Sequence, residues 1–471
     1  SKPLHIGRGV SVLSAGALSA CGGGGTGNSI QKDSGSTAEP SNAIEPSNDT
    51  DAARFLLLAS LSASKGGIAQ LRTLGYEEWL DRKIETPIGL TAAEFFSSHG
   101  YDQADEDAHF DRPHVADNMI WHQLMTGNDD VRKRIALALS NFFVVSVSNL
   151  SIRWPALAIG EYWDILNRHA FGSFRDLLED LALNPAAGVF LDVIGSEKSN
   201  QTTGREPDEN LAREIMQLYS IGLVRLNIDG TPTLTSGKEE PTFNAEDVRG
   251  LAKCFTGYNF DYSGLADIPH PANPSWQVQH PDSVRRRITA DPSKWRVSGK
   301  ESLHSPAEKS FLGVKIPAGS DAEATLKIAL DTLFSHGNVG PFFSKQMIQY
   351  LITSNPSASY VERVSRVFND NGKGVRGDLR SVFKAIFLDS EAINPVTGSQ
   401  SAYGKLREPT VRLAQWGRTF GASSQSGKWI MDDLSRQQDQ LGQSPLRAPS
   451  VFGFFRPQFS RIGSESHSAG L

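Results

Sequence analysis

Helical periodicity is the feature that most constrains the fold of this chain. From Asp51 onward apolar residues recur at helical spacing, and runs of alternating β-branched residues are scarce. Pro, Gly, Asn and Asp separate the periodic segments, as the ends of helices require. The segments that we expect to be helical are residues 53–59, 76–83, 115–125, 129–147, 161–170, 174–183, 209–221, 244–256, 321–334, 339–353, 360–369, 378–388 and 405–420. The sequence therefore predicts a mainly α protein, built as one large helical domain over residues 51–457.

Two stretches interrupt the helical pattern. Residues 225–240 contain Asn-Ile-Asp-Gly at 227–230, which is typical of a tight turn, and they predict a small β-hairpin. Residues 260–317 contain several Pro and Trp residues, lack helical spacing, and form too long a stretch for an ordinary connector. Their aromatic side chains favour a packed segment. The expected fold therefore has a long irregular insertion and at most a small β-hairpin.

The bulk composition limits the classes of protein to consider. Hydrophobic residues make up 39% and charged residues 21% of the 471, the usual proportions for a globular protein with a substantial core. The net charge of −6 argues against a protein that is basic overall, so no nucleic-acid partner is expected. No apolar run approaches the roughly 18 residues that a membrane-spanning helix needs.

The first fifty residues differ in composition from the rest. Lys2 and Arg8 precede a short apolar run that ends in Leu18-Ser19-Ala20-Cys21. A basic start, a short apolar run and small residues before a cleavage site describe a secretory signal. The last four residues resemble the bacterial lipobox, where a peptidase cuts before a cysteine that receives lipid. We expect a lipoprotein-type signal segment over residues 1–20 and a flexible Gly/Ser/Pro-rich tether over residues 21–50.

This interpretation makes Cys21 the lipidation site and the membrane a partner through that anchor. The protein would then be exported to the periplasm, the outer membrane or the cell surface. The alternative is an N-terminal extension with an incidental cysteine. If Cys21 carries lipid, only Cys254 remains, so an intramolecular disulfide cannot form. The neighbours of Cys254 predict a small buried apolar residue rather than a nucleophile.

Residues 207–222 hold the most informative single helix. Pro207 and Asp208 mark its entry, and Gly222 is placed to stop it. At 100° per residue Asn210, Arg213, Glu214 and Gln217 share one narrow stripe, and apolar residues occupy most of the remaining surface. A surface helix has the opposite proportions. We therefore expect a mostly buried helix whose polar stripe faces partners or a cavity.

This stripe supplies the first candidate site. Glu209 and Arg213 are four residues apart and can pair, and Glu214 lies beside them. Two carboxylates near an arginine in a low-dielectric pocket could act as general acid and base. Glu209, Arg213 and Glu214 are therefore catalytic candidates, with Asn210 and Gln217 as ligand-binding candidates. The alternative is a buried salt-bridge network that fixes helix packing.

A second set of polar residues lies in apolar or Pro/Gly contexts further along the chain. It consists of His304 as a catalytic candidate, of Lys309, Lys405, Arg407 and Glu408 as ligand-binding candidates, and of Lys345. If these residues converge on the polar stripe, they form a cationic pocket suited to a carboxylate, phosphate or sulfate. Otherwise they serve as local caps and ion pairs.

Two other patterns are weaker. The spacing of His109, His114 and His122 does not match a zinc motif or one helix face, so no metal site is expected. Residues 372–377 fit G-x-G-x-x-G, but this stretch follows a predicted helix instead of a strand. The phosphate-binding geometry of a dinucleotide fold requires the strand, so a turn is the better interpretation.

Several sequence blocks, in their order and spacing, point to a known family. They are residues 131–140, 169–172, 207–222, 247–248, 256–258, 304–313, 341–346, 353–356, 377–379, 404–409 and 449–452. Together they resemble the bacterial domain of unknown function 1800 family, a group of exported, largely helical proteins. The resemblance implies export and an α-rich fold, and it supplies no activity. Residues 61–64 and residues 458–471 depart from the family pattern, and we expect the latter to be an atypical end of the kind a truncation produces.

Two classes of function remain open from sequence. The first is an exported envelope protein, either an enzyme or a ligand-binding protein, with a buried Glu/Arg pocket. The second is a non-enzymatic scaffold or assembly protein of the cell envelope. The sequence indicates no cofactor, substrate or protein partner, and it does not decide whether the protein is an enzyme.

Overall fold

The computed structural model describes residues 45–104, 109–297, 301–394 and 403–455. The expected signal segment, the lipidation site at Cys21 and residues 458–471 lie outside these ranges. So does most of the expected tether, and the first helix begins at Asp49, within the last residues assigned to the tether.

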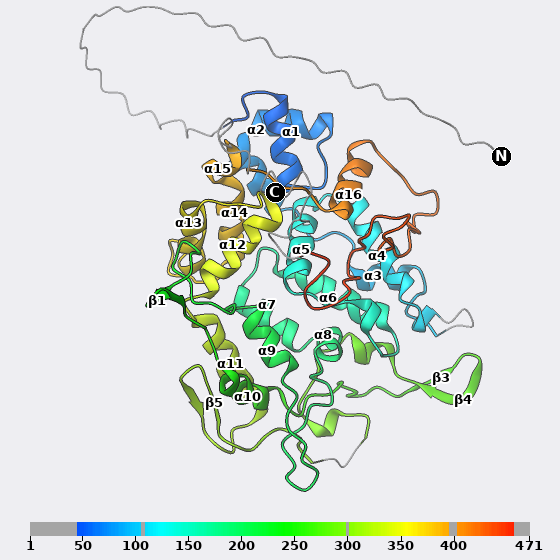
Figure 1. Cartoon of the computed structure of the whole chain (residues 1–471). Coiled ribbons are helices and arrows are strands. Elements are labelled where there is room, and N and C mark those ends of the chain that lie inside the picture. The colour runs from blue at the N-terminus through cyan, green and yellow to red at the C-terminus, as the bar shows by residue number, and fades with distance from the viewer. Residues whose placement is uncertain (1–44, 105–108, 298–300, 395–402, 456–471) are drawn as a thin grey trace, which may run out of the picture. The chain divides into compact units, whose positions relative to one another are not determined.

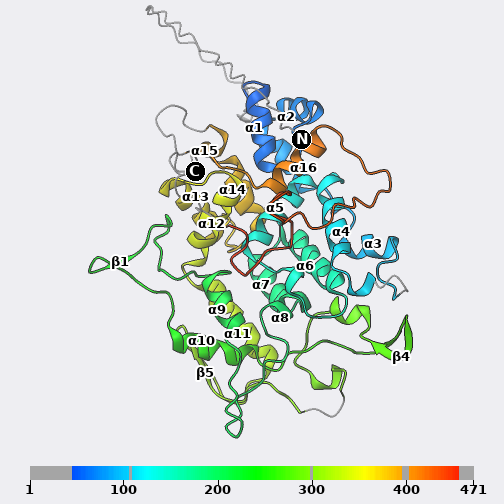
Figure 2. The ribbon, with the colours of Figure 1, turned by 45° about the vertical axis from the view of Figure 1, so that its right-hand side comes forward.

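The described residues are mainly α-helical, as the sequence predicts. Their sixteen α-helices are α1 (Asp49–Ala59), α2 (Lys65–Ile84), α3 (Ala92–Ser98), α4 (His114–Met125), α5 (Asp130–Phe142), α6 (Pro155–His169), α7 (Phe174–Ala182), α8 (Pro185–Phe190), α9 (Asn210–Gln217), α10 (Ala245–Ala252), α11 (Ala322–Ser335), α12 (Val339–Leu351), α13 (Ala358–Asn369), α14 (Leu379–Leu388), α15 (Ser390–Ile393) and α16 (Pro409–Thr419). Figure 1 shows α5 and α6 in the middle of the helical body, with α12–α14 on one side and α3 and α4 on the other. Figure 2 shows the same arrangement from a second direction.

The strands form three two-stranded antiparallel sheets within the described residues. They pair β1 (Leu234–Thr235) with β2 (Lys238–Glu239), β3 (Ile268–His270) with β4 (Asn273–Val278), and β5 (Lys309–Phe311) with β6 (Val314–Ile316). The expectation of at most one hairpin is therefore wrong.

The missed hairpins lie in the long insertion, where their turns carry no usual signature. The β5–β6 turn places Leu312 and Gly313 at φ 47° and 79°. Such a turn needs positive φ at both positions, and Asn-Gly is its usual sequence. The expected turn at residues 227–230 forms, and Leu226 and Pro232 make an antiparallel β-bridge next to it. The pairing of β1 with β2 begins beyond this turn.

The core is centred on α5, which packs against α2, α4, α6 and α12. Val131, Ile135 and Leu139 recur on one side of α5 and are completely buried. The helix ends at Phe142, short of the expected residue 147, because Phe143 leaves helical geometry at φ −96° and ψ 62°. The β-branched residues that follow favour an extended chain, and a short 3₁₀ turn covers residues 147–149.

Gly222 closes the turn that follows helix α9, as its sequence predicts. The backbone N–H groups of Ile221 and Gly222 both donate to the carbonyl of Met216, at 3.0 and 2.9 Å. Gly222 has φ +70°, a conformation that glycine adopts without the strain of a side chain. The regular helix is shorter than the expected 209–221, because residues 218–220 already form the closing turn.

Candidate functional site

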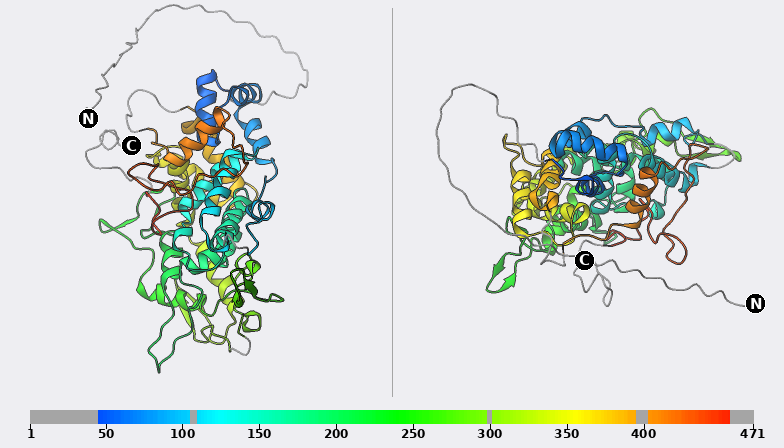
Figure 3. Two further views of the ribbon diagram at one scale, coloured as in Figure 1. Left: turned by 90° about the vertical axis from the view of Figure 1, so that its right-hand side faces the viewer. Right: turned by 90° about the horizontal axis from the view of Figure 1, so that it is seen from above.

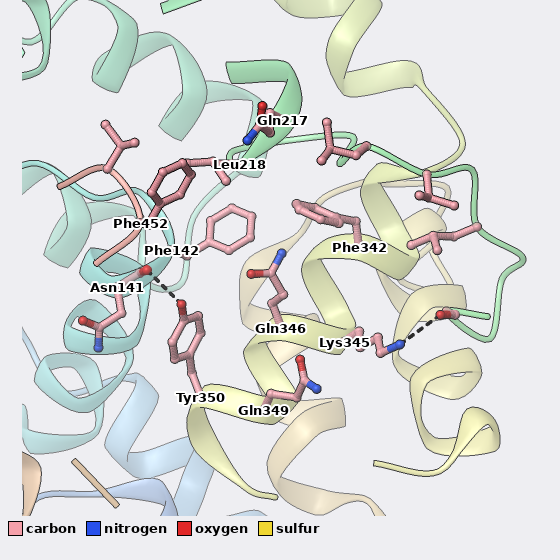
Figure 4. A pocket seen from close by; sticks show the side chains of 15 residues that line it. Asn141, Phe142, Gln217, Leu218, Phe342, Lys345, Gln346, Gln349, Tyr350 and Phe452 are labelled. Carbon is pink, nitrogen blue, oxygen red and sulfur yellow. Dashed lines mark hydrogen bonds between the residues drawn. The ribbon is translucent and has the colours of Figure 1, made fainter. Parts of the chain in front are cut away.

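A cavity of about 330 Å³ lies beside the central helix, where segments distant in sequence meet. Its walls come from the end of α5, the end of α9, one face of α12, residues 223–230 and residues 451–452 (Figure 4). The lining residues are Asn141, Phe142, Gln217, Leu218, Leu223, Val224, Leu226, Gly230, Phe342, Lys345, Gln346, Gln349, Tyr350, Val451 and Phe452. We call it the amide pocket, after Asn141, Gln217, Gln346 and Gln349. Its volume lies within the range of about 300–1,000 Å³ usual for small-molecule sites.

Helix α12 supplies one whole wall of the amide pocket. Phe342, Lys345, Gln346, Gln349 and Tyr350 follow helical spacing and therefore share a face. The other face, with Phe343, Met347, Ile348 and Leu351, is completely buried in the core. Core packing therefore fixes the orientation of the lining face.

Three hydrogen bonds to backbone carbonyls hold this wall in place. Tyr350 Oη donates to the carbonyl of Asn141 at 2.9 Å, and Lys345 Nζ donates to the carbonyl of Gly230 at 3.1 Å (Figure 4). Gln349 Nε2 donates to the carbonyl of Ser354 at 3.1 Å. The first two bonds tie α12 to α5 and to residues 223–230 across the pocket, and the third holds Gln349 to the loop that follows α12.

Two other amides remain available to a ligand. Gln217 and Gln346 are half-buried, and their side chains form no hydrogen bond within the described part of the chain. Figure 4 shows Gln346 pointing toward the rings of Phe142 and Phe342, whose centroids are 6.0 Å apart. Each amide offers two donors and an acceptor. The pocket therefore presents unsatisfied polar groups between apolar walls.

Lys405 and Glu408 support the amide pocket from behind Tyr350. Lys405 Nζ lies 6.0 Å from the centroid of the Tyr350 ring and pairs with Glu408 at 2.8 Å. Arg134, which is fully buried, donates to the carbonyl of Tyr350 at 3.1 Å. Burial alone would raise the pKa of Glu408, but the charges of Lys405 and Arg134 hold it below its ordinary value. The guanidinium of Arg407 donates to the carbonyl of Leu57.

The predicted Glu/Arg pocket on α9 does not form as expected. Arg213 and Glu209 pair at 2.6 Å, and their side chains are 45% and 37% exposed. The expectation that both are buried is wrong, because α9 is a short helix and this part of its stripe faces solvent. Glu214 is buried, as predicted. The side-chain amide of Asn210 donates to the carboxylate of Asp192 at 2.8 Å. Gln217 is the member of the stripe that lines the amide pocket.

Glu209 instead lines a second cavity, of about 480 Å³, next to α10. Acidic residues dominate its wall, including Glu206, Glu246 and Asp247. Its charges are already engaged, because Arg249 pairs with Glu246, and Asp247 accepts from the backbone of Asn244 and of Leu312. This cavity therefore offers fewer free polar groups than the amide pocket.

His304 and Lys309 stabilise the loop that leads into β5. The ring nitrogen Nδ1 of His304 donates to the carbonyl of Thr256 at 3.0 Å, and burial lowers the pKa of this histidine. Lys309 is completely buried and donates to the carbonyl of Ser305 at 2.8 Å. Neither residue lines either cavity. Lys345 of the second set meets Gln217 of the stripe in the amide pocket, but the other members do not join them in one cationic pocket.

The sequence indicated Gln217 and Lys345 as site residues, but not the rest of the α12 wall. Lys345, Gln346 and Gln349 interrupt an otherwise apolar helix, and that pattern was available as a signal. In the described part of the chain, no group of three or more His, Cys, Asp or Glu side chains could hold a metal ion. In the same residues, no helix has both the length and the apolar character needed to cross a membrane.

Comparisons with known proteins give a family but no activity. Neither the curated proteins nor the solved structures contain a match to this chain. A family model described as "Protein of unknown function (DUF1800)" matches residues 54–466 and so extends past the expected domain end at residue 457. That match covers nearly the whole chain, and the protein therefore belongs to the DUF1800 family.

Proposed function

We propose that this chain is an exported, lipid-anchored envelope protein that binds a saccharide in the amide pocket. The observation that carries this proposal is the pair of amides, Gln217 and Gln346, which have no hydrogen-bond partner among the described residues and lie beside aromatic side chains. A saccharide carries hydroxyl groups around its edge and C–H groups on its faces. Hydroxyls match amide donors and acceptors, and C–H faces pack on rings such as those of Phe142 and Phe342.

The lining of the pocket favours binding over acid–base catalysis. Among its described residues there is no carboxylate, imidazole or thiol. Its ionisable groups are Lys345 and Tyr350, and both donate to backbone carbonyls. General acid–base catalysis needs a group that can exchange a proton with the substrate. The exposed Glu209–Arg213 pair lies outside this pocket and does not supply one.

Export and anchoring rest on the N-terminal sequence. The order of Lys2 and Arg8, a short apolar run, Leu18-Ser19-Ala20-Cys21 and a polar tether supports a lipoprotein signal. Mass spectrometry of the protein purified from its membrane fraction tests this directly. We expect a mature chain that begins at a diacylated Cys21, and a Cys21→Ser variant that is not lipidated.

Calorimetric titration with a panel of bacterial envelope saccharides tests the binding proposal. We expect saturable binding to the wild-type chain, reduced about tenfold in Gln346→Leu, which corresponds to a loss of about 1.4 kcal/mol. Gln70→Leu is the matched control, because Gln70 is exposed on α2, away from the pocket lining. If no saccharide binds, or both variants bind equally, the proposal fails and the scaffold alternative is favoured.

A further inference from the structure

Helix α16 has an exposed face made of aromatic and basic side chains. Arg412, Trp416 and Phe420 follow each other at four-residue intervals, so they project from one side. The side chains of Trp416 and Phe420 are 60% and 75% exposed, and their ring centroids lie 6.3 Å apart. Arg412 is exposed and forms no ion pair with any described residue. We call these three residues the α16 face.

The flank of α16 next to this face is tied to the end of α1, and the helix itself packs on α4. Gln415 donates to the carbonyls of Leu57 and Ser60, at 2.7 and 3.0 Å. The backbone N–H of Ala63 donates to Thr419 Oγ1 at 3.0 Å. Figure 3 shows α1, α2 and α16 gathered at one end of the helical body. The α16 face therefore lies at the same end of the helical body as the first helix of the chain.

A second basic residue lies close to this face. Lys65 is the first residue of α2, two positions after Ala63, which bonds to Thr419. Lys65 is exposed and makes no ion pair within the described residues. Two aromatic rings with flanking cations match the interface of an anionic bilayer, where aromatic side chains lie at headgroup level and basic side chains meet lipid phosphates.

We propose that the α16 face rests on the surface of the membrane to which Cys21 is anchored. This inference depends on the lipid anchor of the proposed function. A Gly/Ser-rich linker as long as the segment from Cys21 to α1 has a root-mean-square end-to-end distance of about 30 Å, which would keep the domain close to the bilayer. The anchor turns docking into an intramolecular event, so even a weak interfacial affinity is enough to orient the domain.

Other exposed apolar side chains fit a membrane less well. Trp276 is a single tryptophan on β4, with its ring near that of His270. Leu223 and Phe452 form part of the amide pocket. The α16 face differs from both in having two neighbouring rings, adjacent positive charge and the entry of the tether at the same end.

Vesicle co-sedimentation of the mature chain, residues 21–471 with Cys21→Ser, tests the proposal. Residues 1–20 are omitted because their apolar run would bind lipid on its own. We expect binding to phosphatidylglycerol vesicles and a drop of at least tenfold in the partition coefficient of the Trp416→Ser/Phe420→Ser variant. Trp276→Ser is the matched control and should bind as the parent does. Arg412→Gln should weaken binding to phosphatidylglycerol and leave the weaker binding to phosphatidylcholine unchanged.

Equal partitioning of the double variant and the parent would overturn the inference. So would a parent chain that is dimeric and becomes monomeric in the double variant without any change in lipid binding. The substituted side chains are exposed, so the thermal unfolding midpoint should stay within about 2 °C of the parent, which separates lost binding from misfolding. Mass spectrometry of Cys21 tests the anchor independently, so failure of the anchor and failure of the α16 face can be told apart.

Discussion

Replacing Gly222 with alanine tests how the turn after α9 shapes the amide pocket. Gly222 has φ +70°, and a Cβ atom there would lie 2.6 Å from Cε2 of Phe342 and 2.7 Å from Cδ2. Phe342 forms part of the pocket wall. The substitution therefore combines a strained backbone with a clash against a lining side chain.

The expected loss of stability has two parts. A left-handed conformation costs a non-glycine residue about 1–2 kcal/mol. Overpacking adds about 1–3 kcal/mol, toward the lower end here, because the ring of Phe342 borders a cavity into which it can move. We therefore expect the free energy of unfolding of Gly222→Ala to fall by about 2–4 kcal/mol. The displaced ring should also narrow the pocket and weaken ligand binding.

Gly237→Ala is the matched control for this experiment. Gly237 has φ +77°, and an added Cβ would meet nothing within 4 Å. It should therefore lose only the backbone part, about 1–2 kcal/mol. Urea unfolding of the three proteins, followed by tryptophan fluorescence, measures the difference. Equal losses in the two variants, or unchanged ligand binding in Gly222→Ala, would refute the role assigned to Phe342.

Three further predictions concern buried ionisable groups. Burial raises the pKa of Asp164 to about 6, although hydrogen bonds from Ala92 oppose the rise. The folded state therefore binds a proton more tightly than the unfolded state does, and the free energy of unfolding falls as the pH rises from about 4 to about 6. Chemical unfolding at pH 4 and at pH 7 should show that the free energy of unfolding of Asp164→Asn rises by about 3 kcal/mol relative to that of the wild type. A difference that does not change with pH would contradict this. Arg447 pairs with buried Asp117 at 2.9 Å, so Arg447→Met should lower the free energy of unfolding by about 3–5 kcal/mol at pH 7.5, with recovery in the Asp117→Asn/Arg447→Met double variant. Burial raises the pKa of the Cys254 thiol to about 12. Ellman's reagent should therefore leave this thiol unmodified in the native Cys21→Ser chain and modify it after unfolding. A rapid reaction in the native state would disprove the burial of Cys254.

The helical fold could be predicted because most helices carry their own signals. Gly222 closes the turn after α9 as expected, and its positive φ explains why glycine stands there. Helix α3 was missed although Thr91 and Glu94 form a capping box that the sequence displays. Hairpins such as β5–β6 were missed because a Leu-Gly turn has no strong local signature.

The site was harder to predict than the fold. Gln217 was recognised from its stripe, but Asn141, Gln346 and Phe452 come from distant segments that only tertiary packing brings together. Arg213 was expected to be buried from the proportions of its helix, yet those proportions do not reveal which side of α9 faces solvent. Lys405 was identified as a site residue, and its place behind Tyr350 required the fold.

The side-chain amide signals of glutamine give the most direct test of the amide pocket. In a saccharide titration of ¹⁵N-glutamine-labelled protein, the signals of Gln217 and Gln346 should shift saturably with one dissociation constant, while that of Gln70 stays fixed. Shifts confined to glutamines outside the pocket, or no saturable shift at Gln217 and Gln346 with any saccharide that binds, would contradict the account.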